Sequence, residues 1–470
     1  MSGEEYVSPL SNRYAPRKIR EHFSDTKRFR IWRALWVALA ESQKELGLPV
    51  TEQQIDEMRK FQNDINLSRA RELEKKTRHD VMAHILAFGE QAANARPIIH
   101  MGATSAFVTD NSDMVIIKEA VEIIESQICG VISALKEFAL KYKNVVTLGY
   151  THLQPAQPVT AGKRACLWIQ DLLYDIESLS FARKMLRFRG VKGTTGTQAS
   201  LMMLFDGDEK KVKELDKLVT NKMGFEETVA VTGQTYPRKI DWYLLASLSS
   251  IAQSASKFAT DVRLLSGFGE MEEPQEKEQV GSSAMPHKKN PMRCERITAL
   301  SRYVISLADN AAQTAAAQWL ERSLDDSANR RLSIPESFLA VSAILNIYIS
   351  VASGMKLVEK NIEERLAKQL PYLASEGILM ASVKAGADRQ TVHERLRTLT
   401  RSARSSEEFI EAVKKDTIFD SIKGQIESLV SPLYLAGRAA SQVSEFISGI
   451  VDPVLKKHTV EKDSFEELTV

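Results

Sequence analysis

The chain has 470 residues, of which 43% are hydrophobic and 26% charged, values typical of a soluble globular protein with two or three packed domains. Its 63 Lys and Arg residues nearly balance 61 Asp and Glu residues, which disfavours nucleic acid or an anionic membrane as the main partner. The three cysteines, Cys129, Cys166 and Cys294, are far apart and predict neither a disulfide framework nor a zinc site. They indicate a reducing compartment.

Residues 1–18 contain no apolar stretch of the kind found in signal peptides, and acidic residues near the start disfavour a transit peptide. We therefore expect a cytoplasmic location.

The middle of the chain is predicted to form five long helices. Apolar side chains recur there at alternating spacings of four and three residues, as in the seam of a helix bundle. The pattern is clear in three segments and weaker in two, namely 114–142, 244–265 and 338–355, then 161–186 and 297–318. Shorter, charge-rich helices are expected before and after them. The predicted fold class is all-α, with three helical domains at residues 1–105, 106–358 and 359–470.

Residues 337–355 carry no charge on any face of the predicted helix. The run is long enough to span a bilayer, but its Ser, Asn and Gly residues make it a weak candidate for a membrane span. A five-helix bundle alone offers too little cover for such a helix, so we expect its outer side to meet a helix from another copy of the chain.

The first candidate site segment is TRHDVMAH at residues 77–84, in which Arg78, His79 and Asp80 are consecutive. The alternative is an ordinary solvated helix start, with Asp80 near the helix N-terminus. His79 and His84 are five residues apart rather than four as in a zinc-binding HExxH helix, which disfavours a metal site.

Two further polar segments precede predicted long helices. HMGATSAFVTDNSD at residues 100–113 is rich in side chains that cap helices, and Asp110 and Asn111 are interpreted largely in that role. GYTHLQPAQPVTAGKR at residues 149–164 places His152 in a loop near a helix start, free to act as an acid or base near neutral pH. A lone histidine in such a loop is nevertheless more often structural.

The segment GSSAMPHKKNPMRCERI at residues 281–297 combines serines with closely spaced basic side chains. A serine hydroxyl is a poor base unless its alkoxide is stabilised, which the cations of Lys288 and Lys289 and loop N–H groups can provide. Gly281 permits a hinge and the prolines restrict the backbone, so the segment can close over a ligand. The alternative is a basic surface loop.

A fifth segment, QWLERSLDDSANRR at residues 318–331, supplies Arg322, Arg330 and Arg331, whose forked guanidinium groups suit phosphates and carboxylates. The glycine-rich segment at residues 190–200 lacks the GK[ST] ending of a nucleotide P-loop, so no ATP-hydrolysing role is expected.

Together these segments resemble the fumarase/aspartase superfamily, because GSSAMPHKKNP matches its signature GSSxMPxKxNP at every defined position. Within that superfamily, TRHDVMAH, GATS, THLQPAQP, GQTYPRK and LDDSANRR resemble the adenylosuccinate lyase family over nearly the whole chain. The variable signature position, often tyrosine in close relatives, is His287 here.

The resemblance implies a β-elimination that releases fumarate from adenylosuccinate, giving AMP, and from succinylaminoimidazole carboxamide ribotide, giving AICAR, in purine nucleotide biosynthesis. By that resemblance Ser282, in the signature loop 281–291, is the general base, and Lys288 and Asn290 stabilise the developing charge. His152 is the general acid that protonates the leaving nitrogen, and His79 assists binding or orients this acid.

The resemblance also implies small-molecule succinyl-nucleotide substrates, no cofactor, no metal, no nucleic acid and no membrane. It implies a homotetramer with a twenty-helix core, in which each site draws on three subunits. The substrate-binding residues that it implies are Arg13, Tyr14, Arg78, His79, Asp80, Thr104, Ser105, Gln234, Lys288, Asn290, Arg296, Arg322, Ser327 and Arg331.

Two alternatives remain at this point. An argininosuccinate lyase-type enzyme would share the bundle and the signature loop, although TRHDVMAH and LDDSANRR argue against it. A non-catalytic, crystallin-like structural bundle is the other, and His152, Ser282 and Lys288 argue against that.

Overall fold

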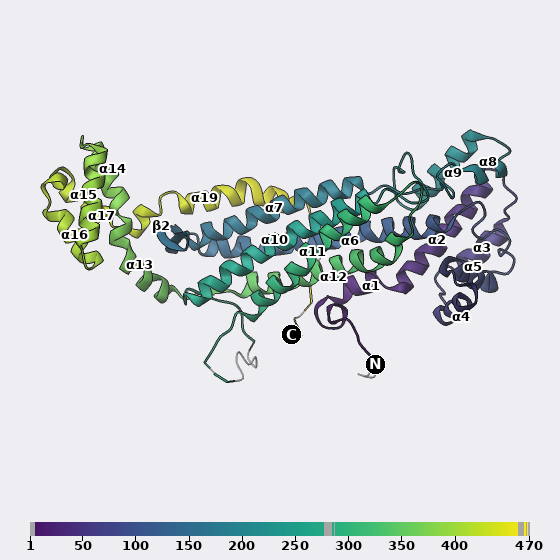
Figure 1. Cartoon of the computed structure of the whole chain (residues 1–470), viewed down its shortest axis with the longest axis horizontal. Helices are drawn as coiled ribbons and strands as arrows, with labels where there is room; N and C mark the ends of the chain where they lie inside the picture. The colour runs from purple at the N-terminus through teal and green to yellow at the C-terminus, as the bar shows by residue number, and fades with distance from the viewer. Residues whose placement is uncertain (1–4, 277–283, 286, 459–464, 467, 469–470) are drawn as a thin grey trace.

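The computed structural model describes residues 5–276, 284–285, 287–458, 465–466 and 468. Figure 1 shows an elongated molecule, with a long helix bundle in the middle and a group of shorter helices at each end. Helices dominate every part of it, which confirms the predicted all-α fold class.

In the described part of the chain, five long helices form the bundle, as the spacing of apolar residues predicts. They are α6 (Ser105–Lys141), α7 (Ala161–Met185), α10 (Lys239–Gly267), α11 (Met292–Ala317) and α12 (Asp325–Gly354). The seam side chains are buried, and Ile124, Leu248 and Val341 are fully enclosed. α6 begins nine residues before the segment predicted at 114, because Thr104 is its N-cap.

The helices at one end of the bundle come from two parts of the chain (Figure 1). They are α2 (Asp25–Glu45), α3 (Glu52–Phe61), α4 (Leu67–Thr77), α5 (Asp80–Gln91), α8 (Ala199–Leu204) and α9 (Glu209–Lys222). The short helical turn Leu10–Tyr14 and α1 (Arg17–His22) instead lie along α12.

The other end has its own apolar core, formed around Ile378, Phe409 and Ile426. Its helices are α13 (Glu359–Leu373), α14 (Ser375–Lys384), α15 (Arg389–Ser402), α16 (Ser406–Lys415), a 3₁₀ helix (Thr417–Gln425), α17 (Ile426–Leu429) and α18 (Pro432–Leu435). The chain then returns along α7 through α19 (Ala439–Phe446), a π-helical turn (Ile447–Val451) and α20 (Asp452–Lys457). The domain boundaries expected at residues 105 and 358 stay predictions.

A β-hairpin separates α6 from α7, where the sequence analysis expected only a loop. Strands β1 (Val146–Thr151) and β2 (Gln154–Thr160) pair antiparallel, and His152 and Leu153 form the turn with φ of 54° and 56°. Two-residue hairpin turns favour such positive φ values because they match the twist of the strands. A second antiparallel pair joins β3 (Met271–Glu272) to β4 (Lys356–Leu357).

The charge-free run at residues 337–355 does not need another copy of the chain to cover it. Residues 337–348 are all buried within one chain, and 78% of the most apolar window of α12 is buried. α12 packs against α6, α10 and α11, and α1 and the Leu10–Tyr14 turn add further cover. The charge-free run is therefore no argument for a second copy, because helices outside the five-helix set cover it within one chain.

Asp175 is a carboxylate inside the bundle, 1% exposed, that accepts a 2.6 Å hydrogen bond from Ser250 Oγ on α10. Burial raises the pKa of this carboxyl to about 6. Because this lies above the value of about 3.9 expected in the unfolded chain, ionisation of Asp175 opposes folding. Its contribution to stability is therefore complete below about pH 4 and is lost as the pH rises through about 6.

We predict that Asp175→Asn makes the protein more stable than the parent at about pH 8, by up to about 3 kcal/mol, since each pKa unit corresponds to about 1.4 kcal/mol. The difference should shrink as the pH falls and disappear near pH 4, on the scale set by those pKa values. Urea unfolding at both pH values measures it. A stability difference that does not change with pH would contradict the assignment.

Candidate active site

A cavity of about 910 Å³ opens at the end of the bundle where α5, α6 and α12 meet, and its size suits a small-molecule ligand. Its walls also include α2 and the loop that leads into α10. Among the described residues, nine of the predicted site residues line it, namely Arg78, His79, Asp80, Thr104, Ser105, Gln234, Arg322, Ser327 and Arg331. The structure thus brings together segments that are up to about 250 residues apart in the sequence.

His79 caps the N-terminus of α5 and faces the N-terminus of α6. Its Nδ1 accepts a 3.3 Å hydrogen bond from the Met82 N–H, and its Nε2 lies 3.3 Å from Ser105 Oγ. Because Nδ1 acts as an acceptor, we assign the proton of the neutral ring to Nε2, which then donates to Ser105. The left-handed conformation of Arg78 (φ 55°) reverses the chain between α4 and α5 and so places His79 at the cavity wall.

The cavity presents guanidinium groups to a ligand. Arg331 Nη2 donates a 2.6 Å hydrogen bond to Asp80 Oδ2, which links α12 to α5, yet the Arg331 side chain remains 56% exposed. Arg322 Nε is buried and has no hydrogen-bond partner among the residues that the structure describes. Such donors suit carboxylate or phosphate oxygens.

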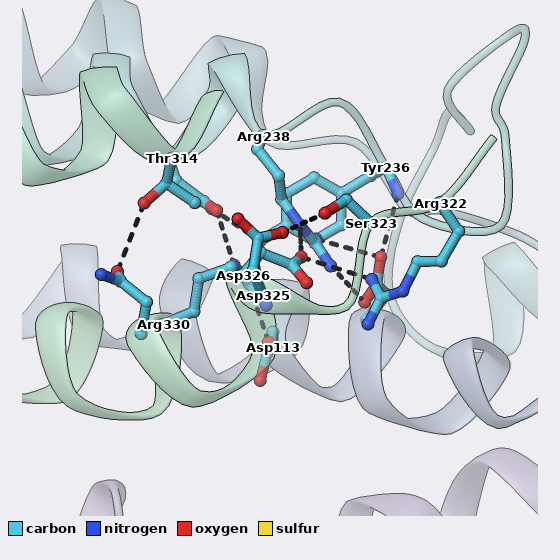
Figure 2. Close-up of polar contacts among 12 residues, drawn as sticks. Asp113, Tyr236, Arg238, Thr314, Arg322, Ser323, Asp325, Asp326 and Arg330 are labelled. Carbon is cyan, nitrogen blue, oxygen red and sulfur yellow. Dashed lines mark hydrogen bonds and ion pairs between the residues drawn. The ribbon is translucent and has the colours of Figure 1, made fainter. Parts of the chain in front are cut away.

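A buried network of charged side chains lies beneath this wall (Figure 2). Arg238 binds Asp110 through both terminal nitrogens, each at 3.1 Å, and Asp326 through Nε at 2.6 Å. Arg330 binds Asp241 at 2.7 Å and Asp113 at 3.0 Å. The network joins α6, α10 and α12 at the cavity floor.

The pKa values of two carboxyl groups in this network shift in opposite directions. Burial alone would raise the pKa of Asp110, but the guanidinium groups of Arg238 and Arg330 hold it below its ordinary value. Burial raises the pKa of Asp113 in spite of its contact with Arg330. Asp110 therefore ionises more readily than an ordinary aspartate, and Asp113 less readily.

Two interpretations from the sequence need correction here. Asp110 and Asn111 do not cap a helix, because α6 begins at Ser105 and places both inside it. Asn111 instead exchanges hydrogen bonds with the backbone of Gly190, at 3.1 and 3.2 Å. Arg330 is occupied by carboxylates of its own chain and is 8% exposed, so it is not a free ligand-binding fork.

Sequence reasoning also missed Arg238, which lies within GQTYPRK but was not chosen as a site residue. Aspartates and arginines inside otherwise apolar helical patterns were the available signal, since charged side chains are rarely buried unless they are paired.

The remaining predicted residues lie away from this cavity. Arg13, Tyr14 and Arg296 line a smaller cavity of about 200 Å³, where the Arg296 guanidinium lies 5.8 Å from the centre of the Tyr14 ring. His152 is exposed at the hairpin turn, and β2 and α5 lie at opposite ends of the bundle in Figure 1.

The signature loop is only partly described. Lys288 is exposed and Asn290 is half-buried, while Ser282 lies outside the described residues. No group of three or more His, Cys, Asp or Glu side chains that could hold a metal ion occurs in the part of the chain that the structure describes.

We predict that Arg238→Leu destabilises the protein by about 3–5 kcal/mol, because it leaves the buried carboxylates of Asp110 and Asp326 unpaired. The matched control is Arg397→Leu, which removes an exposed pair with Glu394 and should leave stability nearly unchanged. Urea unfolding measures both variants. Equal stabilities for the two would show that the buried network contributes nothing.

Comparisons with known proteins show the family of the chain. A family model described as lyase matches residues 13–306, and one described as adenylosuccinate lyase C-terminus matches residues 371–446. The chain is 48% identical to an adenylosuccinate lyase of Saccharomyces cerevisiae, with 96% of each chain covered. It is 44% identical to an adenylosuccinate lyase of Schistosoma mansoni, with 97% of each covered.

Among solved structures, a fumarate lyase from Mesorhizobium sp. BNC1 superposes with a TM-score of 0.82 at 21% identity, over 93% of this chain and 99% of that one. A 3-carboxy-cis,cis-muconate lactonizing enzyme from Pseudomonas putida gives the same TM-score at 20% identity, over 95% and 99%. These likenesses show the fold. The near full-length identity to the sequence relatives shows more, and the chain belongs to the adenylosuccinate lyase family, as its motifs predict.

Proposed function

We propose that the protein catalyses β-elimination of fumarate from adenylosuccinate, giving AMP, and from succinylaminoimidazole carboxamide ribotide, giving AICAR. The observation that carries this proposal is the cavity lined by His79, Arg322 and Arg331, in a chain 48% identical to an adenylosuccinate lyase. Both substrates carry a phosphate and two carboxylates, which arginine side chains recognise by paired hydrogen bonds. The reaction belongs to purine nucleotide biosynthesis, and we place the protein in the cytoplasm.

The proposed mechanism divides proton removal and leaving-group protonation between two side chains. Ser282 removes a proton from the carbon next to a carboxylate of the succinyl group, and Lys288 and Asn290 stabilise the charge that develops on that carboxylate. His152 protonates the departing nitrogen, which would otherwise leave as a poor anion. His79, whose Nε2 faces the cavity next to Ser105, binds or orients these groups.

The distance between His152 and His79 supports a site shared between subunits. β2, which follows the His152 turn, and α5, which His79 caps, lie at opposite ends of the bundle, and α10 in that bundle has 29 residues and is therefore about 43 Å long. A second copy packed in the opposite direction would bring its hairpin turn to the cavity of the first. We propose that the active form is a homotetramer with a twenty-helix core, in which each site takes residues from three subunits.

Cavity residues and the smaller group of Arg13, Tyr14 and Arg296 would then bind different parts of one substrate. Thr104, Ser105, Gln234 and Ser327 add neutral hydrogen-bonding groups to the arginine-rich wall. In this arrangement no cofactor takes part in the reaction.

The rival substrate is argininosuccinate. A coupled assay with purified protein should detect fumarate released from adenylosuccinate and none from argininosuccinate. Fumarate from argininosuccinate alone would favour the rival enzyme, and none from either substrate would favour a structural role for the bundle.

We predict that His152→Ala and Ser282→Ala each lower kcat for adenylosuccinate by at least about a hundredfold, the usual scale for acid–base groups, without dissociating the oligomer. Steady-state kinetics and size-exclusion chromatography measure both effects.

Mixing the two inactive variants under conditions that exchange subunits should restore partial activity, because hybrid assemblies contain sites with both intact residues. Complete failure to complement after demonstrated exchange would argue against a shared site.

A further inference from the structure

Glu270 is a buried carboxylate where the hairpin, α10 and the C-terminal helices meet, and none of the assigned roles uses it. The residue is 1% exposed. Its N–H donates to Leu265 O at 2.9 Å, and its carbonyl accepts from the Val358 N–H at 2.9 Å. Its backbone is thus bound to the end of α10 on one side and to the segment before α13 on the other.

The Glu270 carboxylate holds three side chains at once. Oε1 accepts hydrogen bonds from Arg365 Nε at 2.8 Å and from the Tyr150 hydroxyl at 3.0 Å, and Oε2 accepts from Thr147 Oγ1 at 3.3 Å. Arg365 Nη2 also donates to the Tyr150 oxygen at 3.1 Å, which closes a ring of three polar groups. Burial raises the pKa of the Tyr150 phenol, so it stays protonated and able to donate.

Thr147 and Tyr150 reach the same carboxylate although they lie three positions apart on β1. Side chains three positions apart on a regular strand point to opposite faces. The pairing is irregular between these two residues, because the register shifts between Leu148 and Gly149 and leaves Gln157 of β2 as the extra residue of a bulge. A side chain at position 149 would lie 2.3 Å from the Gln157 carbonyl oxygen, so glycine is required there.

The position of His152 depends on these anchors, because a two-stranded hairpin has little stability of its own. Tyr150 lies two residues before His152 on β1, and the turn itself is held in a positive-φ conformation. Apolar contacts of Leu148 with Leu366 and Leu370 hold the hairpin against α13. Glu270 adds a polar contact between the hairpin and α13, because it also binds Arg365 of α13.

The residues after Glu270 hold the far end of the signature segment. Glu272 pairs with Lys289 at 3.0 Å, and Glu273 accepts hydrogen bonds from the N–H groups of Arg293 and Cys294 at 2.9 and 3.1 Å. Residues 270–273 therefore connect the hairpin that carries His152 with the chain that follows the signature loop.

We infer that Glu270 is a positioning residue for His152, which it holds through Tyr150 by fixing the hairpin against α13. It touches no substrate and takes no part in proton transfer. The inference rests on the proposed role of His152 as the acid.

The test uses Glu270→Gln and Tyr150→Phe in the full-length protein, with Glu364→Gln as the matched control. Glu364 lies on the same helix as Arg365, and its side chain is 60% exposed. Both test variants should lower kcat for adenylosuccinate roughly ten- to a hundredfold with little change in KM, because a small displacement of a reacting group has effects of that size. The control should behave as the parent.

A double-mutant cycle separates positioning of His152 from general damage. In a His152→Ala background, Glu270→Gln should lower the residual kcat by less than about twofold, since the group it positions is gone. Full additivity of the two losses would overturn the inference. Near-normal kcat in His152→Ala alone would instead overturn the proposed role of His152.

Amide hydrogen exchange, measured by mass spectrometry, gives a second readout that does not depend on activity. Glu270→Gln and Tyr150→Phe should speed exchange in residues 146–160 while exchange in α6 and α12 stays as in the parent. If Glu270→Gln does not fold, Tyr150→Phe carries both measurements. Unchanged hairpin exchange together with unchanged kcat in Tyr150→Phe would refute the inference.

Discussion

The shape of the cavity depends on the ion pairs of the buried Arg238 guanidinium group. It joins Asp110 on α6 to Asp326 on α12 and lies just before α10, so the ends of these helices meet at one charge. Leaving a buried charge without its partner costs several kcal/mol of stability, so separation of the helices at this point is strongly unfavourable. Side chains that face the cavity from α6 and α12, such as Ser105 and Arg331, are held in register by this contact beneath them.

The length of the bundle is the second constraint, and it shapes the proposed chemistry. Long helices give a large buried seam, but they also place the β1–β2 hairpin and α5 at opposite ends of the bundle. In the proposed mechanism, assembly of subunits brings the hairpin of one copy to the cavity of another. The position of His152 in the shared site then depends on how rigidly each subunit holds its hairpin. The contacts of Glu270 with Tyr150 and Arg365 hold it.

Much of the architecture could be read from local patterns. Alternating spacings of four and three predicted the five long helices, because the same side chains that repeat in the sequence are those that pack in the seam. Nine of the site residues predicted from motifs line the cavity. The patterns failed where one segment depends on another: the cover over α12, the hairpin around His152, and the ion pairs of Asp110 and Arg330.

The sequence by itself determined the helical class, the long bundle and the family, because helix periodicity and short motifs are local properties of the chain. Only the tertiary structure decided which charged side chains are paired inside the protein and which remain available to a ligand. Arg330 and Arg331 are neighbours in the sequence, yet Arg330 is buried among carboxylates and the Arg331 side chain is 56% exposed. Burial and the choice of ion-pair partner arise from segments far apart in the chain, so no local pattern could distinguish them.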